Sequence, residues 1–342
     1  MTNRKIVMAL LGAAALAGLY LLLRRVRFDW GIFWQQLRLI SWIHILAGVA
    51  LIWATYWLRA LRWAEFCRPT KAVRARDLVG PQFVGFTAVA LFGRLADLVR
   101  PYLLARRTGL PVSSQVAVYT VERMFDLGAA AIVFSGALAL SPATLEHRDR
   151  FVRVGVGSLA ATLILAAFAI AVRLKGDAVA VWIGGRLKRV SPGLAGGVVD
   201  KILGFRDGLR AVSTLREFAI ALALSLAMWG MIGSAYQQTA LAFVHTPELA
   251  GLSFSRTMLL MAVSLGGSLV QLPVVGWFTQ IAAMAAAMHA FYGAPIEAAT
   301  ACAAMMLLVM TLSIVPPGLV FARIEGVSLK HVADESGAPV AT

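Results

Sequence analysis

The chain has 342 residues, of which 60% are hydrophobic and only 14% are charged. Soluble domains carry charge on about a quarter of their residues, so this composition excludes an ordinary soluble protein and indicates an integral membrane protein. The net charge of +15 does not indicate a nucleic-acid partner, because the Lys and Arg residues lie in short loops between apolar segments. In such loops they set membrane orientation and contact anionic headgroups.

Apolar segments long enough to cross a hydrocarbon core of about 30 Å as helices recur along the chain. They predict an all-α polytopic membrane protein with about six full spans, at residues 6–23, 43–63, 113–140, 152–172, 218–244 and 298–321. Pro316 and Pro317 are expected to break the last turns of the final span. We expect a single transmembrane domain over residues 1–326 and a disordered cytoplasmic tail over 327–342.

Two amphipathic segments lie between the spans. In residues 28–40, aromatic and aliphatic side chains recur at helical spacing, which predicts a helix lying in the membrane interface. Residues 173–216 are basic and contain two amphipathic pieces separated by a Ser-Pro-Gly turn. This composition predicts a cytoplasmic surface segment that rests on the lipid headgroups.

Two further apolar stretches are too short or too interrupted to cross as single helices. The first is 78–92 and the second is the pair 257–270 and 274–292, and we expect both to be broken, re-entrant elements. The interrupting residues are Gly80, Pro81, Gly85, Gly266, Gly267, Pro273 and Gly276. If both termini are cytoplasmic, most of the 32 Lys and Arg residues lie on the cytoplasmic side, and the two broken elements enter from opposite sides. That arrangement is typical of an inverted-repeat transporter.

Six charged residues lie within or directly beside apolar sequence. Such a charge costs about 2.5 to 3.5 kcal/mol at bilayer depth, so it is tolerated mainly where it is paired, faces a cavity or has a function. The candidate headgroup-binding residues are therefore Arg94, Asp97, Arg100, Glu122, Arg123 and Asp126.

The spacing of these residues favours one polar cluster. Arg94, Asp97 and Arg100 follow one another at i, i+3 and i+6, which aligns their charges on one helical face. The two arginines suit phosphate binding, although a salt bridge that only fixes the loop explains the same pattern. Glu122 and Asp126 share a face at i, i+4. Their excess negative charge predicts that Arg94 and Arg100 pack against them.

Six secondary candidates complete the predicted site: Arg59, Arg62, Gln271, Pro273, Gly276 and Gln280. Arg59 and Arg62 lie one turn apart near the end of the second span. Two interpretations are open for them, snorkelling to the cytoplasmic boundary and headgroup contact.

The run from Gly93 to Arg106, GRLADLVRPYLLAR, followed by Glu122, Arg123 and Asp126, resembles the signature of the lysylphosphatidylglycerol synthase transmembrane family. These flippase-like proteins are related to the membrane half of the multiple peptide resistance factors. Asp97 stands in the acid position of the signature. The later family motif is matched less fully, because Gln280 stands where the family has an acid.

The resemblance covers residues of about 46 to 326 and implies a lipid-translocating domain of the cytoplasmic membrane. Its ligand would be a membrane phospholipid or a lipid-linked phosphate. We expect no enzymatic activity, no cofactor, no metal site and no nucleic-acid partner. Two alternatives stay open, a non-transporting scaffold or regulator and a small-solute transporter. The oligomeric state is also open, with a homodimer as one alternative.

Overall fold

The computed structural model describes residues 28–139, 214–267 and 275–327, together with scattered positions between 156 and 199. Within these ranges all regular structure is helical, as predicted. Three stretches are long and apolar enough to cross a membrane: α3 (Trp42–Cys67), α9 (Leu215–Leu241) and Ile296–Ile324. The chain is a multi-pass membrane protein. The predicted span 6–23, most of 152–172 and of 173–216, and the tail after residue 327 lie outside the described residues.

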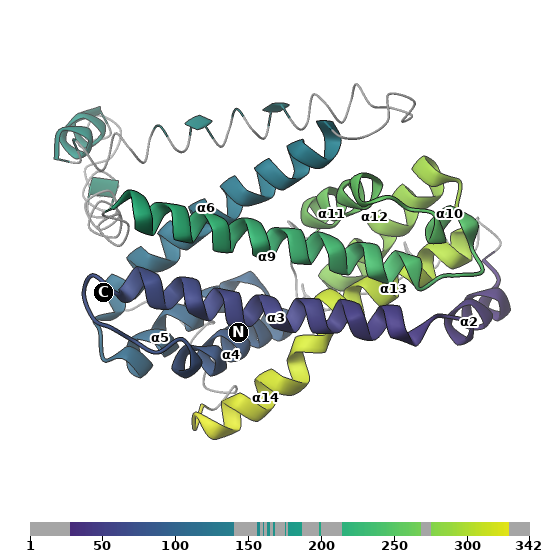
Figure 1. The fold of residues 1–342 in the computed structure, drawn as a ribbon, viewed down its shortest axis with the longest axis horizontal. Helices are drawn as coiled ribbons and strands as arrows, with labels where there is room; N and C mark the ends of the chain where they lie inside the picture. The colour runs from purple at the N-terminus through teal and green to yellow at the C-terminus, as the bar shows by residue number, and fades with distance from the viewer. Residues whose placement is uncertain are drawn as a thin grey trace, which may run out of the picture. The chain divides into compact units, whose positions relative to one another are not determined.

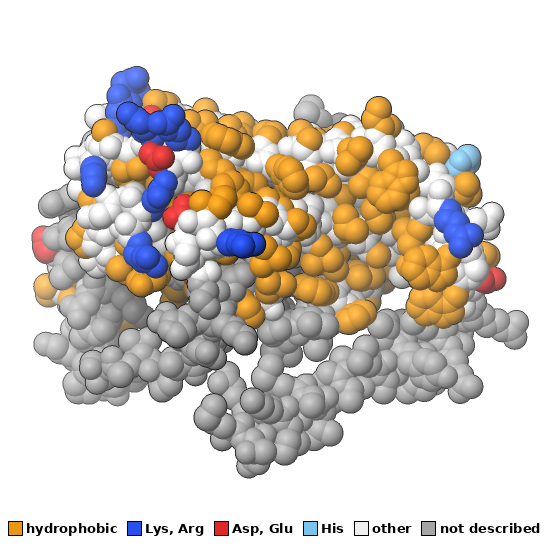
Figure 2. Space-filling model, turned by 90° about the horizontal axis from the view of Figure 1, so that it is seen from below, with side chains coloured by type: hydrophobic (Ala, Val, Ile, Leu, Met, Phe, Trp, Pro, Cys, Tyr) orange, Lys and Arg blue, Asp and Glu red, His pale blue; other side chains and the backbone are white. Residues whose placement is uncertain are grey.

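The chain divides into two compact units. Unit 1 comprises Met1–Val49 and Ser234–Ser313, and unit 2 comprises Ala50–Gly233 and Ile314–Thr342. The long helices α3 and α9 each contribute to both units. Figure 2 shows a surface on which hydrophobic side chains are widely exposed. Ile43 of α3 and Ile324 near the carboxyl end are 75% and 70% exposed. Apolar surface of this extent is expected where a protein meets lipid.

Unit 1 contains a short amphipathic helix and two helical hairpins. Its complete helices are α2 (Trp30–Arg38), α10 (Pro247–Ala250), α11 (Phe254–Gly267), α12 (Val275–Tyr292) and α13 (Ile296–Met310). The Asp29 carboxylate caps α2 by accepting hydrogen bonds from the backbone N–H groups of Gly31 and Ile32, at 2.7 and 3.2 Å. The predicted amphipathic helix therefore exists, and it packs against α13, which in turn packs against α12 (Figure 1).

Unit 2 is built around a different hairpin. Its complete elements are α4 (Arg76–Phe92), the 3₁₀ turn η1 (Arg94–Leu98), α5 (Val99–Thr108), α6 (Val112–Ala139) and α14 (Val315–Ile324). The hairpin turns at Gly93, whose φ of +81° lies in the region that glycine adopts without strain. Helix α4 packs against both α5 and α14, and α5 packs against α6 (Figure 1).

The predicted break inside residues 78–92 is wrong, because α4 is continuous and Pro81 lies in its second turn. A proline there cannot donate to the carbonyl of Asp77, four residues earlier. Arg107 of α5 takes this role, since its Nε donates to the Asp77 carbonyl oxygen at 3.2 Å. The Arg107 side chain of α5 thus supplies the hydrogen bond that Pro81 cannot donate, so the proline does not interrupt α4.

The other predicted interruptions have different outcomes. Helix α11 ends at Gly266 and Gly267, as predicted, whereas Gly276 lies within α12 and does not break it. Pro273 lies outside the described residues. Near the carboxyl end the helix stops at Met310, before Pro316 and Pro317, which occupy the first turn of α14. Prolines fit a first turn well, because the N–H groups that they lack have no intrahelical acceptor there.

Candidate functional site

The interior of unit 2 holds a set of seven charged side chains, named here the charged cluster. They come from α3, η1, α5 and α6, which converge on one point. The members are Arg59, Arg62, Asp97, Arg100, Glu122, Arg123 and Asp126. The cluster therefore contains every predicted primary site residue except Arg94, together with the two secondary arginines.

Glu122 is the centre of the charged cluster. Its side chain is fully buried. Arg62 Nη2 lies 2.8 Å from Glu122 Oε1 and Arg100 Nη1 lies 2.8 Å from Glu122 Oε2. Arg59 and Arg123 are more distant, at 3.7 and 3.4 Å. Four guanidinium groups from three helices thus share one carboxylate, and the prediction from charge balance that Arg100 packs against Glu122 is confirmed.

Asp126, one turn after Glu122, forms the second acidic point. Arg62 Nη2 lies 2.8 Å from Asp126 Oδ1, so a single guanidinium nitrogen bridges both acids. Arg59 and Arg123 approach Asp126 Oδ2 at 3.4 and 3.2 Å. The last of these is an i, i+3 pair within α6. Helix α9 also takes part, because Arg62 Nη1 donates to the Ser225 hydroxyl at 2.6 Å.

The snorkelling interpretation of Arg59 and Arg62 is wrong. Arg62 is completely buried and Arg59 is only 7% exposed. The reason is the two acids on α6, which lie within reach of both guanidinium groups. A buried pair with good geometry offsets the cost of removing the charges from water, so these arginines turn inward instead of extending to the boundary.

Arg100 lies in a cage of aromatic rings and one amide. Its guanidinium carbon is 4.6 Å from the Phe86 ring centroid and 5.0 Å from that of Tyr119. Gln82 of α4 accepts a hydrogen bond from Arg100 Nη1 at 3.3 Å. The close crossing of α4 and α5 depends on Gly85, because a Cβ atom there would lie 2.7 Å from the Cβ of Arg100.

Asp97 lies at the outer edge of the charged cluster. Its carboxylate accepts a hydrogen bond from the Tyr119 hydroxyl, and its Oδ1 lies 3.9 Å from Arg100 Nη2. The stretch around Asp97 is a 3₁₀ turn followed by α5, so the predicted single helical face does not form. Arg94 belongs to η1, but its side chain lies outside the described residues.

The charged cluster has more positive than negative groups. Four arginines face three acids, so the described members carry a net charge of +1. Five buried nitrogen donors at the cluster have no hydrogen-bond acceptor among the described residues: Arg62 Nε, Gln82 Nε2, Arg100 Nε, Arg100 Nη2 and Arg123 Nε. The side chains of Arg123 and Asp97 are 35% and 25% exposed, so the cluster is accessible from one edge. These properties suit an anion with several acceptor oxygens.

The remaining secondary candidates do not belong to unit 2. Gln271 and Pro273 lie outside the described residues, and Gly276 and Gln280 lie on α12 of unit 1. Gln280 Nε2 donates to the Ser264 hydroxyl at 2.6 Å, and the Tyr236 hydroxyl donates to the same oxygen at 2.8 Å. Unit 1 thus has a neutral polar network of its own.

Three members of the site were missed from sequence: Gln82, Tyr119 and Ser225. A signal existed for Tyr119, which lies one helical turn before Glu122 and therefore on the same face. Gln82 was also detectable, as the one amide within the apolar stretch of α4. Ser225 gave no signal, because a serine in an apolar helix is common and usually bonds to its own backbone.

Comparison with known proteins places the chain among lipid-related membrane proteins. Residues 6–318 match the family described as "Lysylphosphatidylglycerol synthase TM region". A segment of 102 residues is 34% identical to the protein named Glycosyltransferase AglD of Haloferax volcanii, and this match covers 28% of the chain and 16% of that relative. The chain therefore corresponds to only a small part of that relative's length. No solved structure gave a significant match.

Proposed function

Because the chain belongs to the lysylphosphatidylglycerol synthase TM region family, we propose that it is a lipid transporter of the flippase or scramblase type. It would move a phospholipid or a lipid-linked phosphate headgroup across the cytoplasmic membrane. The transport involves no covalent step. The name of the Haloferax volcanii relative includes glycosyl transfer, but the small share of that protein that is matched gives no reason to extend this activity to the chain.

The observation that carries the proposal is the excess of guanidinium groups in the charged cluster. In a protein interior, one uncompensated positive charge and several buried donors without hydrogen bonds are costly, and a phosphate diester would offset both costs. Guanidinium groups bind phosphate through two parallel hydrogen bonds, which favours Arg100 and Arg123 as the contacting residues. In this proposal Asp97 orients Arg100, Arg94 adds a further positive charge, and Glu122 and Asp126 line the polar path.

The proposed membrane arrangement has six full spans, two re-entrant pairs and cytoplasmic termini. The α4–α5 hairpin is one candidate pair, since α4 has 17 residues and is about 25 Å long, which is short of the hydrocarbon thickness of about 30 Å. The α11–α12 hairpin of unit 1 is the other. Two hairpins that enter from opposite sides would be typical of an inverted-repeat transporter.

A reconstitution assay tests the proposal. Purified protein in vesicles is supplied with a fluorescent phospholipid in one leaflet, and its movement to the other is timed. Arg123→Gln removes the accessible guanidinium and leaves the closest Glu122 pairs intact, so we expect a fall in rate of about ten-fold. Arg68→Gln is the matched control, because Arg68 forms only an exposed pair with Glu65, and its rate should equal that of the unsubstituted protein.

The scaffold alternative has its own supporting observation, which is that most charges in the cluster are paired within the protein. It predicts that Arg100→Lys lowers the unfolding temperature in detergent, while no lipid movement is seen even for the unsubstituted protein. The transport proposal predicts measurable movement that Arg100→Lys reduces, because lysine keeps the charge but loses the two-pronged geometry. Equal rates for the unsubstituted protein, Arg123→Gln and protein-free vesicles would refute transport.

A further inference from the structure

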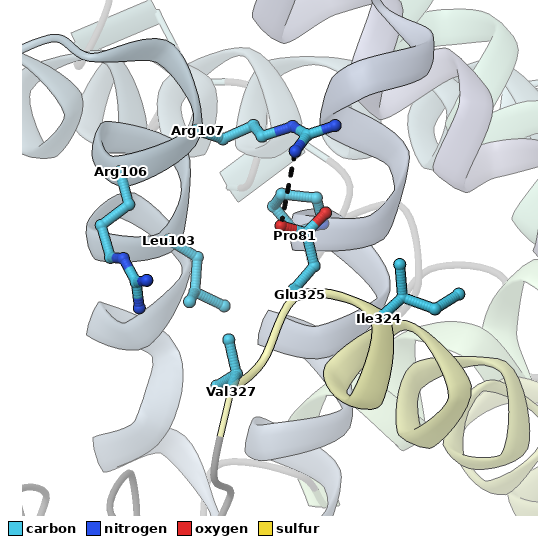
Figure 3. A pocket seen from close by; sticks show the side chains of 7 residues that line it. All are labelled: Pro81, Leu103, Arg106, Arg107, Ile324, Glu325 and Val327. Atoms are coloured by element: carbon cyan, nitrogen blue, oxygen red, sulfur yellow. Dashed lines mark ion pairs between the residues drawn. The ribbon is translucent and has the colours of Figure 1, made fainter.

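A separate cavity of about 290 Å³ lies in unit 2, away from the charged cluster. It is enclosed by the last turns of α5, the second turn of α4 and the end of α14 (Figure 3). Its lining includes three charged side chains, Arg106, Arg107 and Glu325, and the apolar side chains of Leu103, Ile324 and Val327. None of these side chains belongs to the charged cluster, so the cavity needs an explanation of its own.

The two arginines of the cavity are not saturated by the protein. Arg106 is exposed and has no hydrogen bond or ion pair among the described residues. Arg107 lies 3.8 Å from Asp77 Oδ1 and 3.9 Å from Glu325 Oε2, which is well beyond the 2.7–2.9 Å of a close charge-assisted bond. Both guanidinium groups thus have capacity for a phosphate oxygen.

Glu325 gives the cavity a second, opposite charge. It follows directly on the last residue of α14, where the negative end of the helix dipole adds to its carboxylate and favours a cation. Its side chain is only 21% exposed and has Arg107 as its ion-pair partner at 3.9 Å. A ligand that carries an ammonium group beside its phosphate would therefore match both the arginines and the carboxylate of the lining.

The end of the apolar stretch at the cavity indicates a position near the membrane surface. The apolar stretch Ile296–Ile324 ends at the cavity, which is the depth at which headgroups lie. Val320 and Ile324 are 59% and 70% exposed and share a face of α14 at i, i+4. The cavity volume is near the lower limit of ligand pockets, about 300 Å³, so it accommodates a headgroup while acyl chains follow the exposed face of α14.

We propose that this cavity binds the headgroup of a zwitterionic phospholipid as a resident lipid. The phosphodiester lies against Arg106 and Arg107, and a primary ammonium of the ethanolamine type lies against Glu325. The site is distinct from the transport site in the charged cluster, and its existence does not depend on transport.

Native mass spectrometry of the full-length protein in detergent tests this site, with phosphatidylethanolamine and phosphatidylglycerol added separately. Arg106→Gln should weaken the binding of both lipids about ten-fold, because it removes the phosphate contact. Glu325→Gln should weaken phosphatidylethanolamine alone and abolish the preference between the two. The matched controls are Arg76→Gln, an exposed arginine outside the cavity, and Asp77→Asn, the other partner of Arg107. Both should bind as the unsubstituted protein does.

The source of the phosphate is tested with glycerophosphoethanolamine, the soluble headgroup without acyl chains. Ile324→Ser should weaken the lipid but not this soluble headgroup, because only the lipid uses the apolar face. If the soluble headgroup binds as tightly as the lipid, the ligand is not a lipid and the proposal is overturned. It is also overturned if Arg76→Gln weakens binding as much as Arg106→Gln, since binding would then reflect general surface charge.

Discussion

The two units keep buried polar groups in different ways. In unit 2, Glu122 is surrounded by four guanidinium groups at 2.8 to 3.7 Å. In unit 1, Ser264 receives neutral hydrogen bonds from Tyr236 and Gln280, and His44 Nδ1 lies 2.7 Å from the Gln238 side-chain oxygen. A neutral network loses about 1 kcal/mol per bond removed, whereas a broken buried ion pair costs about 3–5 kcal/mol. The buried ionic groups are thus concentrated in unit 2, which is the unit that contains the proposed anion site.

The largest expected effect comes from the centre of the charged cluster. Glu122→Gln leaves the surrounding guanidinium groups with one acid fewer, so we expect a loss of about 3–5 kcal/mol in the free energy of unfolding. Unfolding in mixed micelles with increasing denaturing detergent measures it. Glu65→Gln is the control, because its pair with Arg68 is exposed and is worth less than about 1 kcal/mol. Equal losses for the two variants would contradict a special role of the buried acid.

A smaller effect is expected from the helix crossing that positions Arg100. Gly85→Ala places a Cβ atom 2.7 Å from the Arg100 Cβ, and the resulting helix shift should cost about 1–3 kcal/mol. The control is Gly136→Ala on α6, where the added atom meets nothing within 4 Å. That variant should gain about 0.5–1 kcal/mol from helix propensity. A stabilised Gly85→Ala would show that the crossing is not tight.

The neutral network of unit 1 should respond more weakly. Gln280→Leu removes the 2.6 Å bond to Ser264, and we expect a loss of about 1–2 kcal/mol, measured by the same unfolding assay. Thr279→Ala, whose hydroxyl bonds only within its own helix, should change stability by less than about 0.5 kcal/mol. If Gln280→Leu costs as much as Glu122→Gln, the contrast between the two units does not hold.

The smallest effect is expected at the amphipathic helix. Asp29→Ala removes the cap from the N–H groups of Gly31 and Ile32, at a cost of about 0.5–1 kcal/mol. Faster amide hydrogen exchange at those two positions measures the local opening. Asp29→Asn keeps an acceptor oxygen and should exchange at nearly the original rate. Unchanged exchange in Asp29→Ala would show that aromatic packing alone holds this helix.

Local spacing was sufficient to predict much of the site. The period of α6 put Glu122 and Asp126 on one face, and the balance of charge pointed to Arg100 as their partner, at a distance now seen to be 2.8 Å. Hydrophobic segments likewise located α3, α6 and α9 to within a few residues. These features depend on residue spacing within one helix or on the energetic cost of burying a charge. Both can be inferred directly from the sequence.

The features that could not be predicted from the sequence depend on contacts between residues that lie far apart in the chain. Whether Arg62 extends to water or turns inward is decided by Glu122, 60 positions later, and both outcomes have the same local sequence. The continuity of α4 through Pro81 likewise depends on Arg107, which lies 30 positions after the carbonyl that it contacts. Such effects become visible only when the helices are packed.

The separation of Arg62 from its acids has a consequence for biogenesis. A ribosome that adds about 5–20 residues per second needs about 3–12 s to make the 60 positions between Arg62 and Glu122. During this delay the nascent α3 carries Arg59 and Arg62 without the two acids of α6 that pair with them in the folded protein, and each arginine is disfavoured in lipid. We therefore expect α3 to insert into the bilayer less efficiently alone than together with α6.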